Sequence, residues 1–400
     1  MKSPSKTRDI RESNIKRILL EVRKQRAVVK SSLARTLHLS FATVSSMCSS
    51  LEERGYISRV EMRESTGGRR PVSLRFNPNA RFTLAIHINH DFNTHLALLD
   101  MNHDVVDEAG IFLKGSPSVE ALVEAVDSQT QLLMGKNGIE IDRLMGSGVA
   151  IPGVFNREKG IVQATTSRLL SNISLRERLE ARLGTEIMIE NDANMAALAQ
   201  SISMHRRMSN LLFMYFSAGI GLGIIIDGKI YSGTSGFAGE IGHTRWLVSL
   251  PQAEDTRGVD LKSLVSMQNV LMQYYADEHS EEEVSRDSER LTAGFLAACE
   301  KQEDKALGVL RRTGQIIGFV VAALADLFNP EMVILGGNIA PYLDLLLPVV
   351  REHARQASFT AQSVDLWIAG ASDVESLILR GCGEVTFQEW LQNTSILDSA

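Results

Sequence analysis

The hydrophobic and polar positions of the first 40 residues predict two helices. From Asn14 onward, apolar residues recur at helical spacing, which predicts an amphipathic helix of about three turns. Its apolar positions are Ile15, Ile18, Leu19 and Val22. A shorter helix is expected to begin at Ser31 or Ser32, whose hydroxyls can cap it, and to end at Leu37.

A third helix follows after a tight turn at residues 37–39, capped by Ser40 and ended by Gly55. Its inward positions, spaced as on one helical face, are Val44, Met47, Cys48 and Leu51. Two short helices joined by such a turn predict a helix-turn-helix. Two strands, 56–60 and 72–76, are predicted around the basic tip Thr66-Gly67-Gly68-Arg69-Arg70-Pro71, which is typical of a wing. Residues 1–80 are therefore expected to form a winged helix-turn-helix domain.

Beyond Asn77-Pro78, strand and helix patterns alternate, which indicates an α/β fold. The predicted strands are 82–88, 96–99, 145–151, 187–190, 211–216, 223–227 and 332–335, and the predicted helices are 118–135, 174–183, 194–204, 283–303 and 305–328. Strands followed by helices occur twice. The pattern therefore predicts two α/β lobes, over residues 81–200 and 201–374, with a cleft between them.

Charge is distributed unevenly along the chain. The net charge is −6, yet residues 1–80 hold 17 Lys and Arg against 7 Asp and Glu, while the remainder holds 25 against 41. This asymmetry favours a nucleic-acid-binding segment on an acidic body, with a basic solvated surface as the alternative. Three scattered cysteines predict neither a disulfide framework nor a metal knuckle. The sequence shows no apolar run of roughly 18 to 20 residues, the length that a membrane helix needs, and no signal peptide. A cytoplasmic protein is therefore expected.

The third helix is expected to lie in the major groove of a double-stranded DNA operator. The side chains that it would present are Phe41, Ala42, Thr43, Ser45 and Ser46. No Lys or Arg occurs between Arg35 and Arg54, so phosphate contacts must come from elsewhere. The candidates are Lys16, Arg17, Lys30, Arg35 and the wing. Arg69 and Arg70, raised on two glycines, are predicted to enter a narrow A·T minor groove.

Two short motifs in the body carry candidate chemistry for binding a small molecule. The first is Ile189-Glu190-Asn191-Asp192-Ala193-Asn194, and the second is Gly236-Phe237-Ala238-Gly239-Glu240-Ile241-Gly242-His243. Two carboxylates and an imidazole can accept hydrogen bonds from vicinal hydroxyls, and the small residues let a ring approach. The candidate ligand-binding residues are Asn191, Asp192, Gly236, Glu240 and His243.

These motifs, in order with three others, resemble the ROK family of repressors and sugar kinases. The three others are residues 147–153, 218–221 and 329–337, and the Gly-Gly-Arg wing is similar to that of the repressor branch. The resemblance implies an actin-like (ribonuclease H-like) sugar-kinase-type body of two lobes, with residues 375–400 returning to the first lobe. It also implies that Asp192, Glu240 and His243 hold sugar hydroxyls.

Departures from the family pattern predict that the chain is not an enzyme and needs no cofactor. ROK kinases open with Asp-x-Gly-Gly-Thr, whereas this chain has His87 and then Asn89-His90 where the backbone must approach phosphate. The second phosphate turn is Ser217-Ala218-Gly219, without the family's threonine. The family's zinc cysteines are absent as well, and Asp260 falls at one of their positions, so no metal is expected.

The leading interpretation is a homodimeric or homotetrameric transcriptional regulator, a repressor of carbohydrate metabolism genes whose body closes on a sugar or sugar derivative. One alternative is a regulator controlled by a protein partner, with a vestigial pocket in which Asp192 and Glu240 satisfy local backbone donors. A second alternative is an active ATP-dependent sugar kinase with an added DNA-binding domain.

Overall fold

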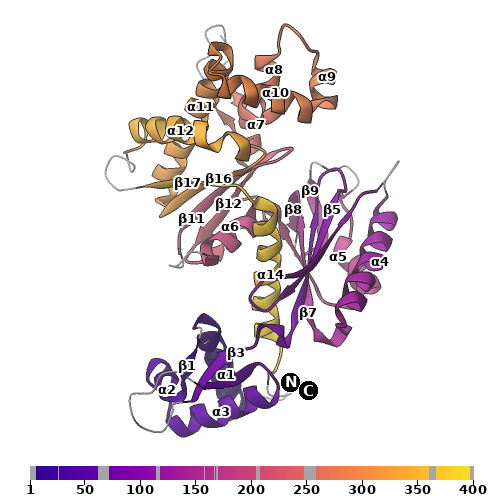
Figure 1. Cartoon of the computed structure of the whole chain (residues 1–400), viewed down its shortest axis with the longest axis vertical. Coiled ribbons are helices and arrows are strands. Elements are labelled where there is room, and N and C mark those ends of the chain that lie inside the picture. The colour runs from indigo at the N-terminus through magenta and orange to yellow at the C-terminus, as the bar shows by residue number, and fades with distance from the viewer. Residues whose placement is uncertain are drawn as a thin grey trace.

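The computed structural model describes residues 6–25, 27–61, 72–113, 118–156, 158–165, 167, 170–203, 208–246, 258–359 and 366–396. The molecule is elongated, with a small N-terminal module at one end and two larger sheets toward the other (Figure 1). The long helix α14 (Val374–Asn393) runs between these parts. The fold is mixed α/β, as the sequence predicts.

The N-terminal module contains the predicted helix-turn-helix and hairpin. Its elements are α1 (Lys6–Lys24), β1 (Val28–Val29), α2 (Lys30–Leu37), α3 (Phe41–Glu53), β2 (Ile57–Glu61) and β3 (Val72–Phe76), with the strands in the order β1-β3-β2. Ser40 caps α3 by accepting a 3.1 Å hydrogen bond from the Thr43 amide, which confirms the predicted cap. His38 makes the tight turn in a left-handed conformation, with φ 54°.

Three details of this module differ from the sequence expectations. Helix α1 begins at Lys6, more than two turns before Asn14, because polar residues extend it beyond its apolar stripe. Helix α2 begins at Lys30 and not after a serine cap; Val29 precedes it, without a side-chain cap. Strand β1 was not predicted, since a two-residue strand leaves no periodic pattern. Arg69 and Arg70, which were predicted to act in the wing, lie outside the described residues.

The first five-stranded sheet of the body has the order β10-β7-β4-β5-β6. Its strands are β4 (Phe82–Ile88), β5 (Thr94–Asp100), β6 (Val105–Ile111), β7 (Leu144–Ile151) and β10 (Ile187–Asn191). Strands β4, β7 and β10 run parallel, and β5 and β6 add an antiparallel meander. Helices α4 (Val119–Asn137) and α5 (Leu175–Leu183) pack on one face through an apolar core. A hairpin of β8 (Gly153–Asn156) and β9 (Ile161–Thr165) follows β7.

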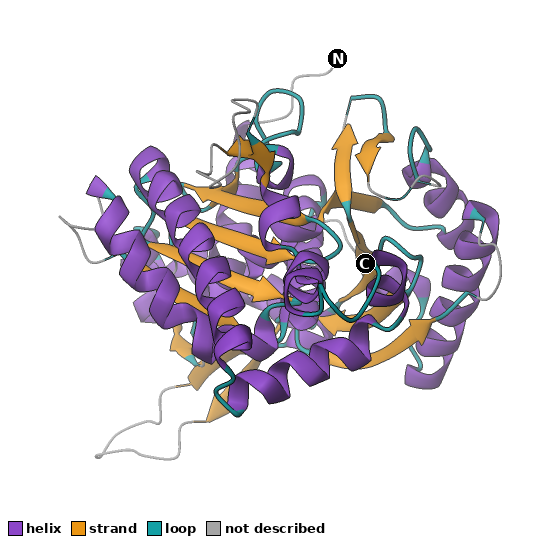
Figure 2. Ribbon diagram, turned by 90° about the horizontal axis from the view of Figure 1, so that it is seen from above, coloured by secondary structure: helices purple, strands orange, loops and turns teal. Residues whose placement is uncertain are grey.

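The second five-stranded sheet has the order β13-β12-β11-β16-β17. Its strands are β11 (Leu211–Phe216), β12 (Ile220–Ile226), β13 (Lys229–Ile230), β16 (Met332–Gly337) and β17 (Trp367–Ala371). The remaining pieces are β14 (Arg245–Trp246), β15 (Val259–Asp260), α7 (Leu261–Val265), α8 (Met267–Tyr274), α9 (Glu281–Arg286), α10 (Ser288–Glu300), α11 (Asp304–Phe328) and α12 (Leu343–Ala357). Seen from above, helices cover the strands of this part (Figure 2).

Two helices that the sequence predicts for this part can be compared with the structure. The single helix expected over 283–303 is wrong, because Asp287 ends α9 and α10 starts directly after it. The predicted helix 305–328 is confirmed as α11. Among the described helices, α11 is the one long and apolar enough to cross a membrane by composition, but half of that stretch is buried inside the protein. It packs against α12, as a core helix does.

Helix α6 (Asp192–Ser203) and α14 lie between the two sheets (Figure 1). Helix α6 follows directly from β10 of the first sheet, yet it packs on β11 and β12 of the second. Helix α14 packs on α6 and on β4 and β7. The division into domains at residues 80, 200 and 374 remains a prediction. The arrangement places the ends of β10 and β12 close together, and this is where the candidate pocket lies.

Candidate functional site

A cavity of about 500 Å³ opens where β10, the β8–β9 hairpin and β12 meet. It is lined by Pro152, Gly153, Val154, Ala164, Thr165, Asn191, Asp192, Tyr215, Ser217, Gly219, Ile220, Gly221, Phe237, Glu240 and His243. Four of the five candidate ligand-binding residues are therefore brought together. The fifth, Gly236, is not among the lining residues; it begins the adjoining loop with a left-handed φ of 86°.

Asn191 and Asp192 reach the cavity because β10 ends there and α6 begins. The Asn191 side-chain nitrogen Nδ2 donates to the Gly153 carbonyl at 3.1 Å, which joins β10 to the hairpin. Asp192 accepts a 2.8 Å hydrogen bond from the Ala193 amide and is only 5% exposed. Burial raises the pKa of Asp192 to about 6, aided by the charge of Glu240 and opposed by His87. The carboxyl group is thus poised between its neutral and charged forms near neutral pH.

Glu240 and His243 are carried by the glycine-containing loop and the short helical turn after it. The Leu222 amide donates to the Gly239 carbonyl at 2.9 Å, so the loop is held against β12. Burial raises the pKa of Glu240, and the nearby His243 works against this. Among the described residues, the Glu240 carboxylate takes no hydrogen bond in the structure. Its oxygens are therefore available to hydroxyl groups of a ligand.

Close to Asp192 lies a histidine–carboxylate pair, His87 and Glu375, that the sequence does not reveal. His87 on β4 is fully buried, and its Nδ1 lies 2.9 Å from both oxygens of Glu375 on α14. No partner is found within the described part of the chain for the other ring nitrogen, Nε2. Burial alone would raise the pKa of Glu375, but the bond to His87 and the charges of His87 and His95 lower it. Only its place in the first turn of a helix capped by Asp373 could have drawn attention to Glu375.

Asp260, the residue at a zinc-cysteine position, has a local structural role. It caps α7, accepting hydrogen bonds of 2.9 Å from both the amide and the hydroxyl of Ser263. The described residues contain no group of three or more His, Cys, Asp or Glu side chains that could hold a metal ion. The expectation that no metal is bound remains a prediction.

Helix α3 presents the face that was predicted to meet DNA. Phe41 is 58% exposed, Ala42 and Ser46 are exposed, and Thr43 and Ser45 are half-buried. The opposite face, with Val44, Met47, Cys48 and Leu51, is buried as the sequence predicts. Burial raises the pKa of Cys48 to about 11, so this residue is an inert core thiol.

Three of the four cations proposed to contact phosphate are engaged within the protein. Lys16 donates to the Gln392 carbonyl at 3.3 Å and lies 3.9 Å from Glu12. Arg17 donates to the Leu37 carbonyl at 3.2 Å, and Lys30 lies 4.0 Å from Glu52. Arg35 is exposed. The sequence could not separate these roles, because a basic residue looks the same whether it faces DNA or a carboxylate.

Comparison with known proteins adds to this geometry. The sequence matches the ROK family over residues 92–379, well over half of the chain. It is 26% identical over 389 residues to a xylose repressor of Caldicellulosiruptor bescii, covering 94% of this chain and 95% of that protein.

Solved structures share the fold. A ROK family transcriptional regulator, described as a homolog of the E. coli MLC protein, matches with a TM-score of 0.77 and 20% identity over 97% of this chain and 99% of its own. A ROK family glucokinase from Streptomyces griseus, solved with glucose and AMPPNP, matches with a TM-score of 0.60 and 18% identity over 76% and 98%. The glucokinase thus matches a smaller share of this chain than the regulator does. The chain belongs to the ROK family.

Proposed function

We propose that this protein is a DNA-binding transcriptional repressor whose body binds a sugar or sugar derivative. The observation that carries the proposal is the combination, in one chain, of a recognition helix with Phe41, Ala42 and Ser46 exposed and a cavity in which the Glu240 carboxylate takes no hydrogen bond from the described residues. Relatives along nearly the whole chain are named xylose repressors. A homodimer or homotetramer acting in the cytoplasm fits this function, because a symmetric oligomer reads two half-sites of an operator.

The cavity supports sugar binding better than the vestigial alternative. A residue kept only to satisfy local backbone donors would be bonded to them, as Asp192 is to Ala193. Glu240 has no such bond among the described residues, although burial of its carboxylate is costly. A cavity of about 500 Å³ is within the usual range of small-molecule sites, roughly 300–1,000 Å³.

Kinase activity is the alternative that the family leaves open, and the neighbourhood of β4 argues against it. His87, near the end of β4, is bonded to Glu375, and Asn89 and His90 follow the strand in place of the glycines of the kinases. A phosphate cradle needs closely approaching backbone amides instead. Incubation with ATP and a sugar panel should therefore give no phosphorylated sugar above a control without protein. Turnover that is abolished by Asp192→Asn would establish the kinase.

The repressor proposal is tested with an operator recovered by selection from random duplex DNA. Fluorescence anisotropy should give specific binding that D-xylose, D-glucose or an amino sugar changes, with matching heat of binding by calorimetry. Phe41→Ala should weaken specific binding while the circular dichroism spectrum stays unchanged. No selected sequence at all would contradict the DNA-binding half. An operator that no sugar affects would favour control by a protein partner.

The wing is proposed to read DNA shape. If Arg69 enters a minor groove, Arg69→Ala should weaken binding to an operator with A·T flanks more than to the same operator with G·C flanks. A phosphate contact would instead be lost equally from both, with the salt slope reduced by about one. Equal losses on both operators would leave the wing as a phosphate clamp.

A further inference from the structure

Helix α14 joins the candidate pocket to the DNA-binding module. Its first turn holds Glu375, which is bonded to His87 beside Asp192. Its middle packs on α6 without intervening side chains, since a Cβ on Gly381 would lie 2.1 Å from the Met195 carbonyl oxygen. Its last turns leave the body and contact the N-terminal module (Figure 1). Because the backbones of α6 and α14 are in direct contact, a displacement of α6 or of the pocket wall must move α14 as well.

The module shares its core with the C-terminal part of the chain. The rings of Tyr56 in the module and Trp390 on α14 lie 5.8 Å apart, and Phe387 and Ile396 belong to the same buried cluster as the apolar face of α1. The Ile396 amide donates to Glu12 on α1 at 2.6 Å. The Ser395 hydroxyl also donates to Glu12 and Lys16 donates to the Gln392 carbonyl, both near the end of α14, whereas the contact around Phe387 and Trp390 is apolar. Apolar contacts are not directional, so they hold the module to α14 without fixing its angle.

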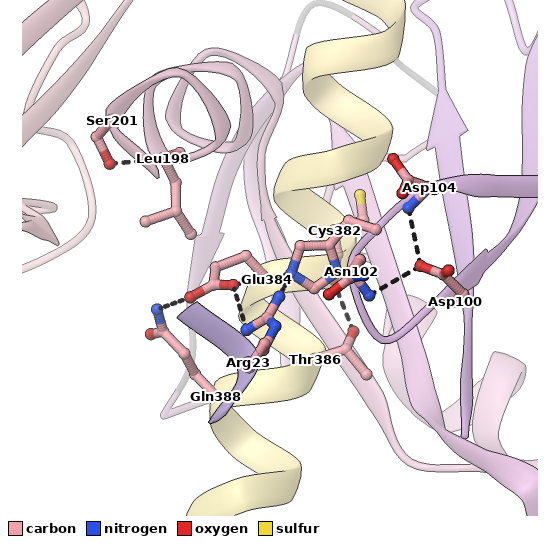
Figure 3. Close-up of polar contacts among 11 residues, drawn as sticks. Arg23, Asp100, Asn102, Asp104, Leu198, Ser201, Cys382, Glu384, Thr386 and Gln388 are labelled. Atoms are coloured by element: carbon pink, nitrogen blue, oxygen red, sulfur yellow. Dashed lines mark hydrogen bonds and ion pairs between the residues drawn. The ribbon is translucent and has the colours of Figure 1, made fainter. Parts of the chain in front are cut away.

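Directional contacts are supplied by a buried cluster of Arg23, His103 and Glu384. Figure 3 labels Arg23 and Glu384 of this cluster. The Glu384 Oε2 atom lies 2.8 Å from His103 Nε2 and 3.5 Å from Arg23 Nη1. Arg23 Nη2 lies 2.6 Å from the same His103 nitrogen, which either donates to Glu384 or accepts from Arg23, and does not do both at once. The Arg23 guanidinium also lies 4.0 Å above the Phe387 ring. These residues come from the module, from the β5–β6 turn and from α14, so the cluster joins three separate parts of the chain.

The surroundings of His103 are shaped to admit its ring. His103 has a left-handed backbone, with φ 65°, which is uncommon for a residue other than glycine. A Cβ on Gly383 would lie 2.6 Å from its Nδ1, so glycine on α14 makes the room. Burial opposes the charge on Glu384, but the bond to His103 and the charge of Arg23 outweigh it and bring the pKa of Glu384 to about 2. The cluster therefore holds a charged carboxylate against a charged guanidinium inside the protein.

We propose that Arg23, His103 and Glu384 are positioning residues that fix the angle of the DNA-binding module on α14, and that α14 transmits movements of the pocket to the module. A buried, charge-assisted cluster has one favourable geometry, whereas the apolar contacts around it tolerate several. The transmission rests on the proposed function, because it concerns regulation of that DNA-binding module. The positioning is a property of the protein without DNA or sugar.

The positioning is tested by a distance measurement on the full chain. The substitutions His38→Cys, on the exposed turn of the module, and Glu140→Cys, on the exposed rim of the first sheet, carry spin labels. The three native cysteines are buried and remain unlabelled. Pulsed electron paramagnetic resonance should give one narrow distance distribution. Glu384→Gln, which keeps the size but removes the charge, should broaden it about twofold because the remaining contacts are less directional.

Two controls keep this result interpretable. Glu389→Gln lies on the same helix and changes a carboxylate that accepts from Asn393 one turn along, so its distribution should match that of the parent. Arg23→Lys keeps the charge but removes the planar guanidinium, so it should also broaden the distribution. This variant replaces Glu384→Gln in the test if that protein fails to fold. A folded Glu384→Gln or Arg23→Lys protein with the parent's distribution would overturn the positioning role.

The transmission is tested from the other end of α14 with Glu375→Gln, which weakens the contact with His87. The mean distance should shift in the parent background and should not shift in the Glu384→Gln background. A shift in both backgrounds, or in neither, would contradict transmission through α14. None of these measurements uses DNA or sugar. They can therefore fail while operator binding succeeds, and the reverse also holds.

Discussion

Two histidine–glutamate pairs lie along α14, and they differ in what surrounds them. At the pocket end, Glu375 bonds to His87 and its side chain is 34% exposed. At the module end, Glu384 bonds to His103, its side chain is 9% exposed, and Arg23 supplies a full positive charge. In each pair one histidine nitrogen has no partner in the described part of the protein. The same two residue types thus form a partly exposed pair without an arginine in one place and a buried pair joined by Arg23 in the other.

The difference indicates how stability and sensitivity are divided over the molecule. The pocket end gathers two carboxylates, Asp192 and Glu240, whose pKa values burial raises, and no arginine or lysine is found among the described residues that line the cavity. The module end pairs its carboxylate with Arg23, whose guanidinium lies over the Phe387 ring. A ligand that donates hydrogen bonds can improve the first environment, whereas the Glu384 carboxylate of the second already has a charged partner in Arg23.

The largest contrast should appear when an aromatic ring is removed from each end. Trp390→Ala empties the buried contact between α14 and the module, and such truncations cost about 3–5 kcal/mol. Phe237→Ala removes a ring that is 42% exposed at the pocket and should change the free energy of unfolding by roughly 0.5 kcal/mol or less. Urea unfolding of both variants measures this. Similar losses of unfolding free energy in the two variants would show that the two ends do not differ in stability.

The two ends should also respond to pH with opposite signs. Asp192 has its pKa raised from 3.8 to about 6, so its contribution is present below pH 3.8 and is lost as pH rises through 6. Asp192→Asn should therefore be the more stable protein at pH 8, by up to about 3 kcal/mol, and the gap should close by pH 4.

Glu384 behaves in the reverse sense. Its pKa is lowered from 4.5 to about 2, so its contribution is present above pH 4.5 and is lost as pH falls through 2. Glu384→Gln should be less stable than the parent by about 3 kcal/mol at neutral pH, with a gap that shrinks on acidification. Unfolding curves from pH 3 to pH 8 record both trends. Gaps that run in the same direction with pH would refute the assigned environments.

Ligand affinity tests the pocket end of this comparison, with a smaller expected change in free energy. Asp192→Ala and Glu240→Ala should each lower the affinity for whichever tested sugar binds by about ten- to hundredfold, because a hydrogen bond to a charged group contributes roughly 1.5–3 kcal/mol. Asp104→Ala serves as the control, since Asp104 pairs with Arg380 on the surface and lies outside the cavity lining. Calorimetry gives the affinities. Undiminished binding in both pocket variants would move the sugar to another site.

The smallest effect is expected from an ion pair on the surface of the module. Arg59 contacts Glu52 at 2.7 Å, but the arginine side chain is 61% exposed and its charge is screened by solvent. Arg59→Ala should leave the unfolding midpoint unchanged within error, in contrast to Glu384→Gln. A clear loss would mean that exposure is a poor guide to the strength of these pairs.

Features that depend on neighbouring residues were accessible from the sequence. The cap at Ser40 and the buried face of α3 follow from spacing alone, and both are confirmed. The pocket motifs also could be read, because each keeps its carboxylate beside small residues that a ring can approach. Their assignment to ligand binding stays a prediction.

Contacts between distant residues were not accessible. Lys16 meets the Gln392 carbonyl 376 positions away, and His87 meets Glu375 288 positions away. Such pairs leave no periodicity in the sequence. The basic residues of α1 were consequently assigned to DNA when one of them holds α14. The break at Asp287 was missed because the apolar spacing of α9 and α10 continues across it.

The sharing of one core between α1 and the last turns of α14 has a consequence for synthesis on the ribosome. Residues 1–80 emerge first, but Phe387, Trp390 and Ile396, which complete their core, emerge more than 300 residues later. At roughly 5–20 residues per second, the nascent module waits on the order of tens of seconds for these side chains. An incomplete chain, whether nascent or left by premature termination, therefore lacks these core side chains, and its N-terminal module should unfold more readily than that of the complete protein.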